Sequence, residues 1–170
     1  MGHLLASVPF FLPMTLSNKL TIDFPEPQKT QVCIYFSNNV ITGTEYCQTQ
    51  NNNSEIEDTA FAHKIEQEVQ AYFQSPDYVF SLPCKLAQGS VFQQKVWQAL
   101  QQIPSGKVKT YGELAKELNT SARAVGNACR HNHFPLIVPC HRVVSASGIG
   151  GFAGDTADKQ KGEMNFIQVK

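Results

Sequence analysis

Short runs in which apolar and polar residues alternate dominate the first half of the chain, and a period of two is typical of strands. Apolar residues occupy alternate positions in 20–24, and β-prone runs follow at 32–36 and 40–44. Residues 37–39, Ser-Asn-Asn, predict a hairpin turn between the last two runs. The polar, Asn-rich stretch at 48–57 predicts a loop.

One amphipathic helix is expected after this loop, with Asp58 or Thr59 as its N-cap and Pro76 beyond its end. Its apolar stripe consists of Ala62, Ile65, Val69 and either Tyr72 or Phe73. The strands and this helix together indicate a small α/β or α+β unit over residues 1–85. No motif in this unit points to a particular chemistry.

After a junction at 83–89, the spacing of apolar residues changes from the period of two of a strand to the period of a helix. Ser90 with Gln93, and Thr110 with Glu113, each have the spacing of a capping box. The apolar face of the first predicted helix consists of Phe92, Val96, Ala99, Leu100 and Ile103. Helices ending at about 118 and spanning 122–131, separated by a tight turn, match a helix-turn-helix pattern within residues 86–170.

Composition places the chain among globular proteins: its 170 residues are 42% hydrophobic and 16% charged, which fits one domain or two small ones. No run of about 18 apolar residues predicts a transmembrane helix. The apolar run at 4–16 lacks a basic region before it and a cleavage site after it, so we interpret it as an ordinary N-terminal segment. Five cysteines at irregular spacing argue against a disulfide framework and favour a reducing compartment.

The net charge of zero conceals an asymmetry along the chain. Residues 1–94 carry 4 Lys or Arg against 9 Asp or Glu, whereas residues 95–145 carry 7 against 2. A basic block in a neutral chain indicates either an anionic partner for that half or a solvated basic face, and charge alone does not distinguish them.

The predicted helix at 122–131 has one face expected to be buried and one expected to be polar. The buried face consists of Val125, Ala128 and Cys129, and the polar stripe, at i, i+4 and i+7, consists of Arg123, Asn127 and Arg130. Gly126 and other small residues keep this helix thin. Its backbone could therefore approach a groove of nucleic acid closely.

Cys140 is the candidate nucleophile, within the unusual sequence Pro139-Cys140-His141-Arg142 that follows the apolar run 136–138. Prolines on both sides of that run stiffen the backbone. A thiol reacts as its thiolate, which nearby His and Arg charges favour. Cys129, in contrast, is expected to be buried and inert.

Two other chemistries can be weighed at Cys140. A zinc site built from Cys129, His131, His133, Cys140 and His141 would not follow the paired spacing of zinc ligands, so no metal is predicted. Protease-type catalysis would require a base in hydrogen-bond reach, and adjacent side chains usually point apart. His141 could act through an intervening water instead, which suits a single deprotonation, although these residues alone leave hydrolytic turnover open.

Residues 139–143, Pro-Cys-His-Arg-Val, resemble the active-site signature of the O6-alkylguanine-DNA alkyltransferases, also called methylated-DNA–protein-cysteine methyltransferases. The resemblance runs from Phe92 to Ala153 and includes the motifs at 92–97, 103–106, 110–115, 122–126 and 150–154. Their order and spacing make it specific. It implies an α+β fold: a small ribonuclease-H-like α/β domain at 1–85, then a mostly α-helical alkyltransferase domain with a helix-turn-helix at 86–170.

The resemblance also implies a single-turnover DNA repair enzyme that needs no cofactor. Cys140 would take the methyl or alkyl group from O6-alkylguanine, flipped out of double-stranded DNA that is bound through its minor groove. The thioether product does not hydrolyse, so each molecule would react once. His141 would remove the thiol proton through water. A monomer that acts in the cytoplasm, away from membranes, is expected.

Further residue roles follow from the same resemblance. Tyr111 would donate a hydrogen bond to guanine N3 and crowd the rotated phosphate, and Arg123 would fill the space that the flipped nucleotide leaves. Asn127 and Arg130 are further expected DNA contacts. Asn132 would order the turn before Cys140. The expected base-binding set is Asn132, Val143 and Ala153.

The segment after residue 154 departs from the family pattern, which continues into a helix with Trp-Leu-Leu and a glutamate that orients the histidine. Residues 155–163 are polar, and Glu163 is the one nearby carboxylate that could substitute. A second hypothesis is therefore a non-enzymatic module that binds alkylated DNA and flags it. A third, a helix-turn-helix transcription regulator, lacks a dimerisation segment.

Overall fold

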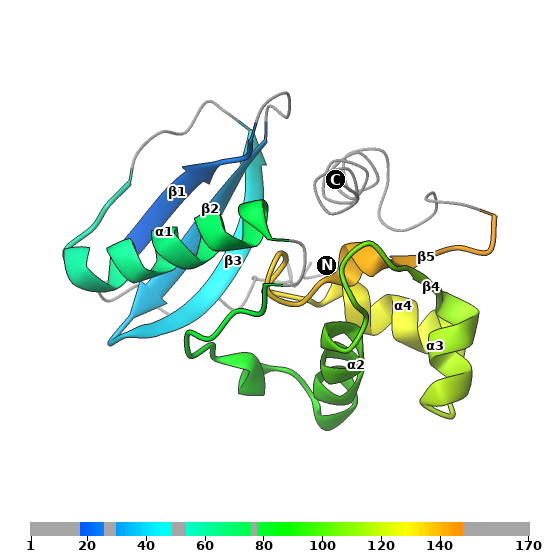
Figure 1. Cartoon of the computed structure of the whole chain (residues 1–170). Coiled ribbons are helices and arrows are strands. Elements are labelled where there is room, and N and C mark those ends of the chain that lie inside the picture. The colour runs from blue at the N-terminus through cyan, green and yellow to red at the C-terminus, as the bar shows by residue number, and fades with distance from the viewer. Residues whose placement is uncertain (1–17, 26–29, 49–53, 76–77, 148–170) are drawn as a thin grey trace, which may run out of the picture.

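The computed structural model describes residues 18–25, 30–48, 54–75 and 78–147. In Figure 1 the described chain forms two parts side by side: a three-stranded sheet crossed by one helix, and a group of three helices with a short strand pair. The fold is therefore mixed α/β with a small antiparallel sheet.

The sheet consists of β1 (Asn18–Asp23), β2 (Thr30–Ser37) and β3 (Val40–Gln48), antiparallel in that order. All three predicted strands are confirmed. The hairpin turn is tighter than predicted, because Ser37 pairs with Val40 and only Asn38 and Asn39 form the turn. Both asparagines have positive φ, 50° and 59°, a conformation that Asn tolerates well and that two-residue hairpins require.

Helix α1 (Thr59–Gln74) begins after Asp58, whose carboxylate accepts a hydrogen bond from the Phe61 N–H, so Asp58 rather than Thr59 is the N-cap. The predicted stripe is confirmed: Ala62, Ile65, Val69 and Tyr72 are all buried. Ring contacts of Phe36 with Phe61, and of Phe24 with Phe73, show which face of the sheet the helix covers.

Three further helices, α2 (Val91–Gln101), α3 (Tyr111–Glu117) and α4 (Ala122–Arg130), make up the second part. A 3₁₀ turn, η1 (Leu86–Gln88), precedes them. Both predicted capping boxes are complete, and Ser121 caps α4 by accepting from the Ala124 N–H. Among the described residues no helix is long and apolar enough to cross a bilayer.

The apolar face of α2 differs from the prediction at two positions. Val96, Leu100 and Ile103 are buried as expected, but Phe92 is 37% exposed and Trp97 is buried instead. Because α2 packs on α4 through its later turns, its first turn lies at the surface. The Trp97 Nε1–H donates to the Ala128 carbonyl of α4 over 3.0 Å, so one side chain joins the two helices.

Replacing Trp97 with Phe is expected to lower the free energy of unfolding by about 1–3 kcal/mol, because the Ala128 carbonyl then loses a buried donor. Chemical denaturation of both proteins measures the difference. Phe92→Leu, which changes an exposed aromatic ring on the same helix, is the control and should have little effect. An equal loss of unfolding free energy in both variants would contradict the stabilising role assigned to the hydrogen bond between Trp97 and Ala128.

The junction between the two parts pairs with the sheet. The Ile41 N–H of β3 donates to the Pro83 carbonyl, and the Lys85 N–H donates back to the Ile41 carbonyl, each over 2.9 Å. Buried Glu68 of α1 accepts from the backbone of Ser81 and Leu82. The segment that leads into α2 is thus fixed against both the sheet and its helix.

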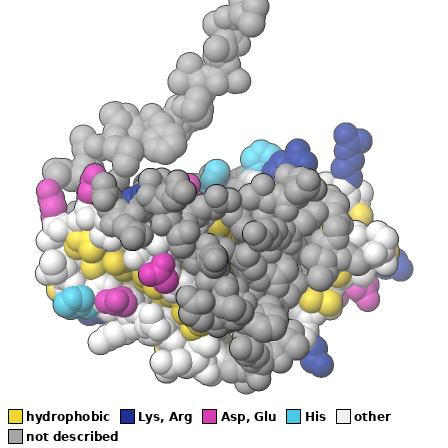
Figure 2. Space-filling model, turned by 90° about the horizontal axis from the view of Figure 1, so that it is seen from above, with side chains coloured by type: hydrophobic (Ala, Val, Ile, Leu, Met, Phe, Trp, Pro, Cys, Tyr) yellow, Lys and Arg dark blue, Asp and Glu magenta, His cyan; other side chains and the backbone are white. Residues whose placement is uncertain are grey.

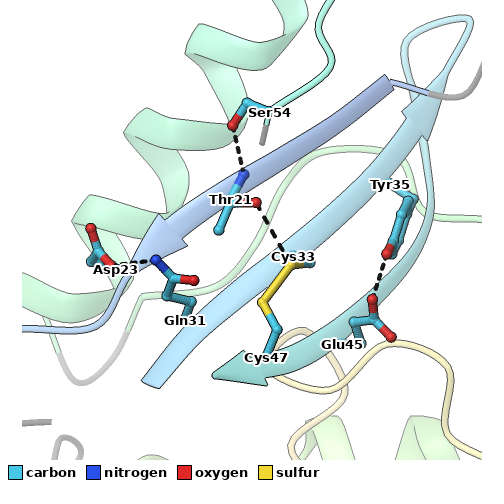
Figure 3. The surroundings of a disulfide bond; sticks show 8 residues. All are labelled: Thr21, Asp23, Gln31, Cys33, Tyr35, Glu45, Cys47 and Ser54. Carbon is cyan, nitrogen blue, oxygen red and sulfur yellow. Dashed lines mark hydrogen bonds between the residues drawn. A yellow bond between two sulfur atoms is a disulfide. The ribbon is translucent and has the colours of Figure 1, made fainter. Parts of the chain in front are cut away.

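A disulfide joins Cys33 of β2 to Cys47 of β3 (Figure 3), whereas the irregular cysteine spacing argued against a disulfide framework. An odd number of cysteines excludes complete pairing but not one bridge between neighbouring strands. The register sets Cys33 opposite Glu45, two positions from Cys47. The resulting Cα–Cα distance of 6.5 Å lies within the range that a disulfide spans. Cys84, Cys129 and Cys140 are not in disulfide bonds.

Candidate active site

A two-residue parallel ladder connects the segments that carry the candidate chemistry. Strand β4 (Lys109–Thr110) pairs with β5 (Val143–Val144), Lys109 opposite Val143. Tyr111 follows β4 directly as the first residue of α3, and the 3₁₀ turn η2 (Cys140–Arg142) directly precedes β5. The ladder therefore fixes the Cys140 segment relative to the start of α3.

Cys140 is partly exposed and not in a disulfide bond, and the Cys140 N–H donates to the Val138 carbonyl over 2.8 Å. The two residues after it are buried: His141 is 3% and Arg142 8% exposed. The thiol thus lies at the surface end of a turn whose two basic side chains are buried.

Arg142 links three parts of the structure. Its Nη1–H donates to the Ile103 carbonyl after α2, and its side chain also hydrogen-bonds Tyr72 of α1. Burial raises the pKa of Tyr72 to about 12, against the opposing effect of the Arg142 charge and hydrogen bond. Tyr72 was predicted only as an apolar stripe residue. No signal in the sequence shows that its hydroxyl meets the segment around Cys140.

The turn before Cys140 is ordered by Asn132, as the sequence interpretation expected. Its Nδ2–H donates to the Val138 carbonyl, and its Oδ1 accepts from the Phe134 N–H, each over 2.9 Å. The same turn contains Leu136 at a φ of 80°, which is uncommon for a residue with a branched side chain.

A cavity of about 1030 Å³ lies between the start of α3, the exposed face of α4 and the residues after β5. It brings together four of the predicted DNA-contact residues. Its lining consists of Tyr111, Gly112, Ser121, Ala122, Arg123, Ala124, Gly126, Asn127, Arg130, Ser145 and Ala146. The cavity lining does not include four other predicted site residues, Asn132, Cys140, His141 and Val143. Of these, the last three lie in β5 or in the turn directly before it, and β5 leads to the lining residue Ser145. Ala153 and Glu163 lie outside the described residues.

Helix α4 has the two predicted faces. Val125, Ala128 and Cys129 are at most 2% exposed, whereas Arg123, Asn127 and Arg130 are exposed toward the cavity. A Cβ added at Gly126 would lie 3.9 Å from Cε1 of Tyr111, so the tyrosine ring lies close to the backbone of α4. A methyl group at Gly126 would therefore be in ordinary van der Waals contact with this ring.

Charge on the surface follows the asymmetry of the sequence. Figure 2 shows most of the visible acidic side chains toward one end of this face and most of the visible Lys and Arg side chains toward the other. Lys109 forms an exposed ion pair with Glu117 over 2.6 Å, and pairs of this kind add little stability. The basic residues that line the cavity are Arg123 and Arg130 of α4.

The chemistry available here is that of a thiol nucleophile with an adjacent imidazole and a tyrosine hydroxyl across the ladder. Within the described ranges no three His, Cys, Asp or Glu side chains converge in a way that could hold a metal ion. His131, one residue of the zinc alternative, contacts the Asn127 carbonyl through Nδ1 over 2.8 Å.

Comparison with known proteins relates these features to a family. The model of the 6-O-methylguanine DNA methyltransferase DNA-binding domain matches residues 91–163. The constitutive methylated-DNA–protein-cysteine methyltransferase of Bacillus subtilis is 39% identical over 120 residues, 69% of this chain and 72% of the relative. The enzyme of that name from Mycolicibacterium paratuberculosis is 45% identical over 104 residues, 59% of this chain and 62% of the relative.

Solved structures agree with the sequence comparison. The O6-methylguanine methyltransferase of Mycobacterium tuberculosis superimposes with a TM-score of 0.71 at 28% identity, covering 91% of this chain and 93% of that one. The same organism's protein in complex with DNA gives a TM-score of 0.66 at 30% identity, covering 88% and 91%. Together with the extent of the Bacillus subtilis match, this shows that the chain belongs to the methylated-DNA–protein-cysteine methyltransferase family.

Proposed function

We propose that this protein is a DNA repair enzyme that transfers a methyl or larger alkyl group from O6 of guanine in double-stranded DNA to Cys140. One observation carries the proposal: the partly exposed thiol of Cys140, next to His141, is fixed by β4 and β5 against the helix that begins at Tyr111. Relatives named for this activity, and a structural neighbour solved with DNA, support it.

The reaction is a displacement at a saturated carbon. The Cys140 thiolate attacks the alkyl carbon, a C–S bond forms, the C–O bond to guanine breaks, and the base leaves with the electron pair. A soft thiolate suits this substitution. His141 takes the thiol proton through a water, and Tyr111 donates a hydrogen bond to N3 of the leaving guanine. The thioether persists, so each molecule reacts once and no cofactor is needed.

DNA binding is assigned to the helix-turn-helix formed by α3 and α4, with α4 toward the minor groove. The exposed stripe of α4 supports this role, since most affinity for duplex DNA comes from cationic contacts to phosphates. Arg123 fills the gap left by the flipped base, and Asn127 and Arg130 contact the backbone. The proposed base-binding set is Asn132, Val143 and Ala153.

The same proposal covers the domain organisation. A ribonuclease-H-like domain occupies residues 1–85, and the alkyltransferase domain occupies 86–170. The protein acts as a monomer in the cytoplasm.

Intact-mass analysis after mixing with an O6-methylguanine duplex tests the proposal. One methyl group, about 14 Da, should be added, and peptide mapping should place it on Cys140. Binding of the duplex without added mass would contradict the enzymatic function and favour a module that binds alkylated DNA and flags it.

Replacing Arg123 with Ala is expected to slow transfer from duplex DNA about tenfold or more, because flipping a base costs a few kcal/mol that an inserted side chain offsets. Transfer from single-stranded DNA, where unstacking costs less, should change much less. Single-turnover rates on both substrates measure the difference. Lys116→Ala removes an equal charge from α3 outside the cavity lining, and an equal duplex-specific loss there would argue against insertion.

A further inference from the structure

Strand β3 contacts the turn that precedes Cys140. The Thr44 N–H donates to the His133 carbonyl over 2.9 Å, and the Thr44 Oγ1–H donates to the Pro135 carbonyl over 2.6 Å. Gly43, one residue earlier, lies beside the same turn: a Cβ there would be in ordinary van der Waals contact with the His133 carbonyl oxygen, at 3.6 Å. One residue of the sheet therefore holds two carbonyls of a turn that is 91 residues away in the sequence.

This turn determines the position of the Cys140 backbone. Asn132 holds it from inside, through Val138 and Phe134, and the Cys140 N–H donates to the same Val138 carbonyl. Leu136, within the turn, has positive φ, and conformations of this kind persist only where the surroundings enforce them. The two hydrogen bonds from Thr44 are part of the surroundings that hold the turn in this conformation.

Tyr46 follows Thr44 by two positions, so both side chains lie on the face of β3 that α1 covers. The Tyr46 ring packs edge-on against Phe24 with centroids 5.8 Å apart. Its hydroxyl oxygen is buried and lies against the backbone of Leu136 in this turn, and no acceptor for the hydroxyl proton is found among the described residues. Burial, and then the charge of Cys140, raise the pKa of Tyr46 well above its ordinary value, against the opposing hydrogen bond from the Leu136 backbone. The hydroxyl therefore keeps its proton beside the site.

We propose that β3 is part of the apparatus that positions and ionises Cys140: Thr44 holds the turn in register, and the Tyr46 hydroxyl turns toward the sulfur and donates a hydrogen bond to the thiolate. The inference rests on the transfer reaction assigned above. Tyr46 keeps its proton throughout, while the thiol proton leaves through His141 and water. Both residues act through Cys140, and neither touches the DNA.

Two measurements on the full chain test the two roles separately. The first is the pH profile of Cys140 alkylation by iodoacetamide, followed by peptide mass spectrometry, which reports the ionisation of the thiol without DNA. The second is the single-turnover rate of methyl transfer from an O6-methylguanine duplex. Thr42→Val, on the same strand and half-buried, is the matched control for both.

Tyr46→Phe is expected to move the midpoint of the alkylation profile to higher pH by about one unit, because the thiolate loses a donor. Thr44→Val is expected to leave that midpoint unchanged and to slow methyl transfer about tenfold or more, since the sulfur is misplaced. Thr44→Ser retains the hydroxyl and should restore the rate. This rescue distinguishes a lost hydrogen bond from a general loss of stability.

The outcomes separate the inference from the proposed function. If the wild-type protein transfers methyl groups and both variants behave like Thr42→Val, the inference is overturned. If Thr44→Ser transfers methyl groups as slowly as Thr44→Val, the proposed role of the Thr44 hydroxyl is overturned. If the wild-type protein transfers nothing while Tyr46→Phe still shifts the alkylation profile, the proposed function fails and the role of Tyr46 stands.

Discussion

Replacing Cys140 with Ser is expected to abolish alkyl transfer while leaving duplex binding within about twofold of wild type. Serine has nearly the same size, so the η2 turn should persist, but a hydroxyl ionises far less readily than a thiol and is a poor nucleophile toward saturated carbon. Intact mass after incubation with an O6-methylguanine duplex measures the transfer. A gel-shift titration with the same duplex measures binding.

Cys84→Ser is the matched control for this substitution. Cys84 is a half-buried free thiol whose Sγ–H donates to the Leu82 carbonyl, and a serine hydroxyl can make the same bond. Burial, and then the charge of Glu68, raise the pKa of Cys84 to about 11, so this thiol is protonated and unreactive at neutral pH. The control should transfer at the wild-type rate. Added mass on the Cys140→Ser protein would assign the nucleophile elsewhere.

The features predicted correctly from the sequence are those decided by neighbours along the chain. Capping boxes at Ser90 and Thr110 depend on residues three positions apart, and both are present. The buried and exposed faces of α4 follow from a period of 3.6 residues.

The features that the sequence did not predict depend on contacts between distant segments. Thr44 and Pro135, or Tyr72 and Arg142, meet only because the sheet packs against the turn around Cys140. A Thr in an alternating strand has the same pattern whether it faces water or a carbonyl 91 residues away. The Cys33–Cys47 bridge was missed for the same reason, since strand register cannot be derived from a count of cysteines.

These distant contacts converge on one short segment. Thr44 holds the turn before Cys140, Arg142 ties the residues after it to α1 and α2, and β5 connects it to the cavity. The sheet and the helices therefore meet at the segment that carries the proposed nucleophile. Precise placement is what a displacement reaction demands, because a misplaced reactant loses much of the advantage of proximity.

His141→Gln is expected to slow methyl transfer at neutral pH by roughly 10²–10⁴-fold, the usual contribution of a positioned base. Glutamine fills similar space beside Cys140 but cannot accept the thiol proton. The loss should shrink as the pH rises, because bulk solvent then generates the thiolate without a base. Single-turnover rates across a pH series measure both effects, with His133→Gln, which changes an exposed side chain, as the control. A loss that is constant across pH would make His141 a packing residue and leave the deprotonation to another group.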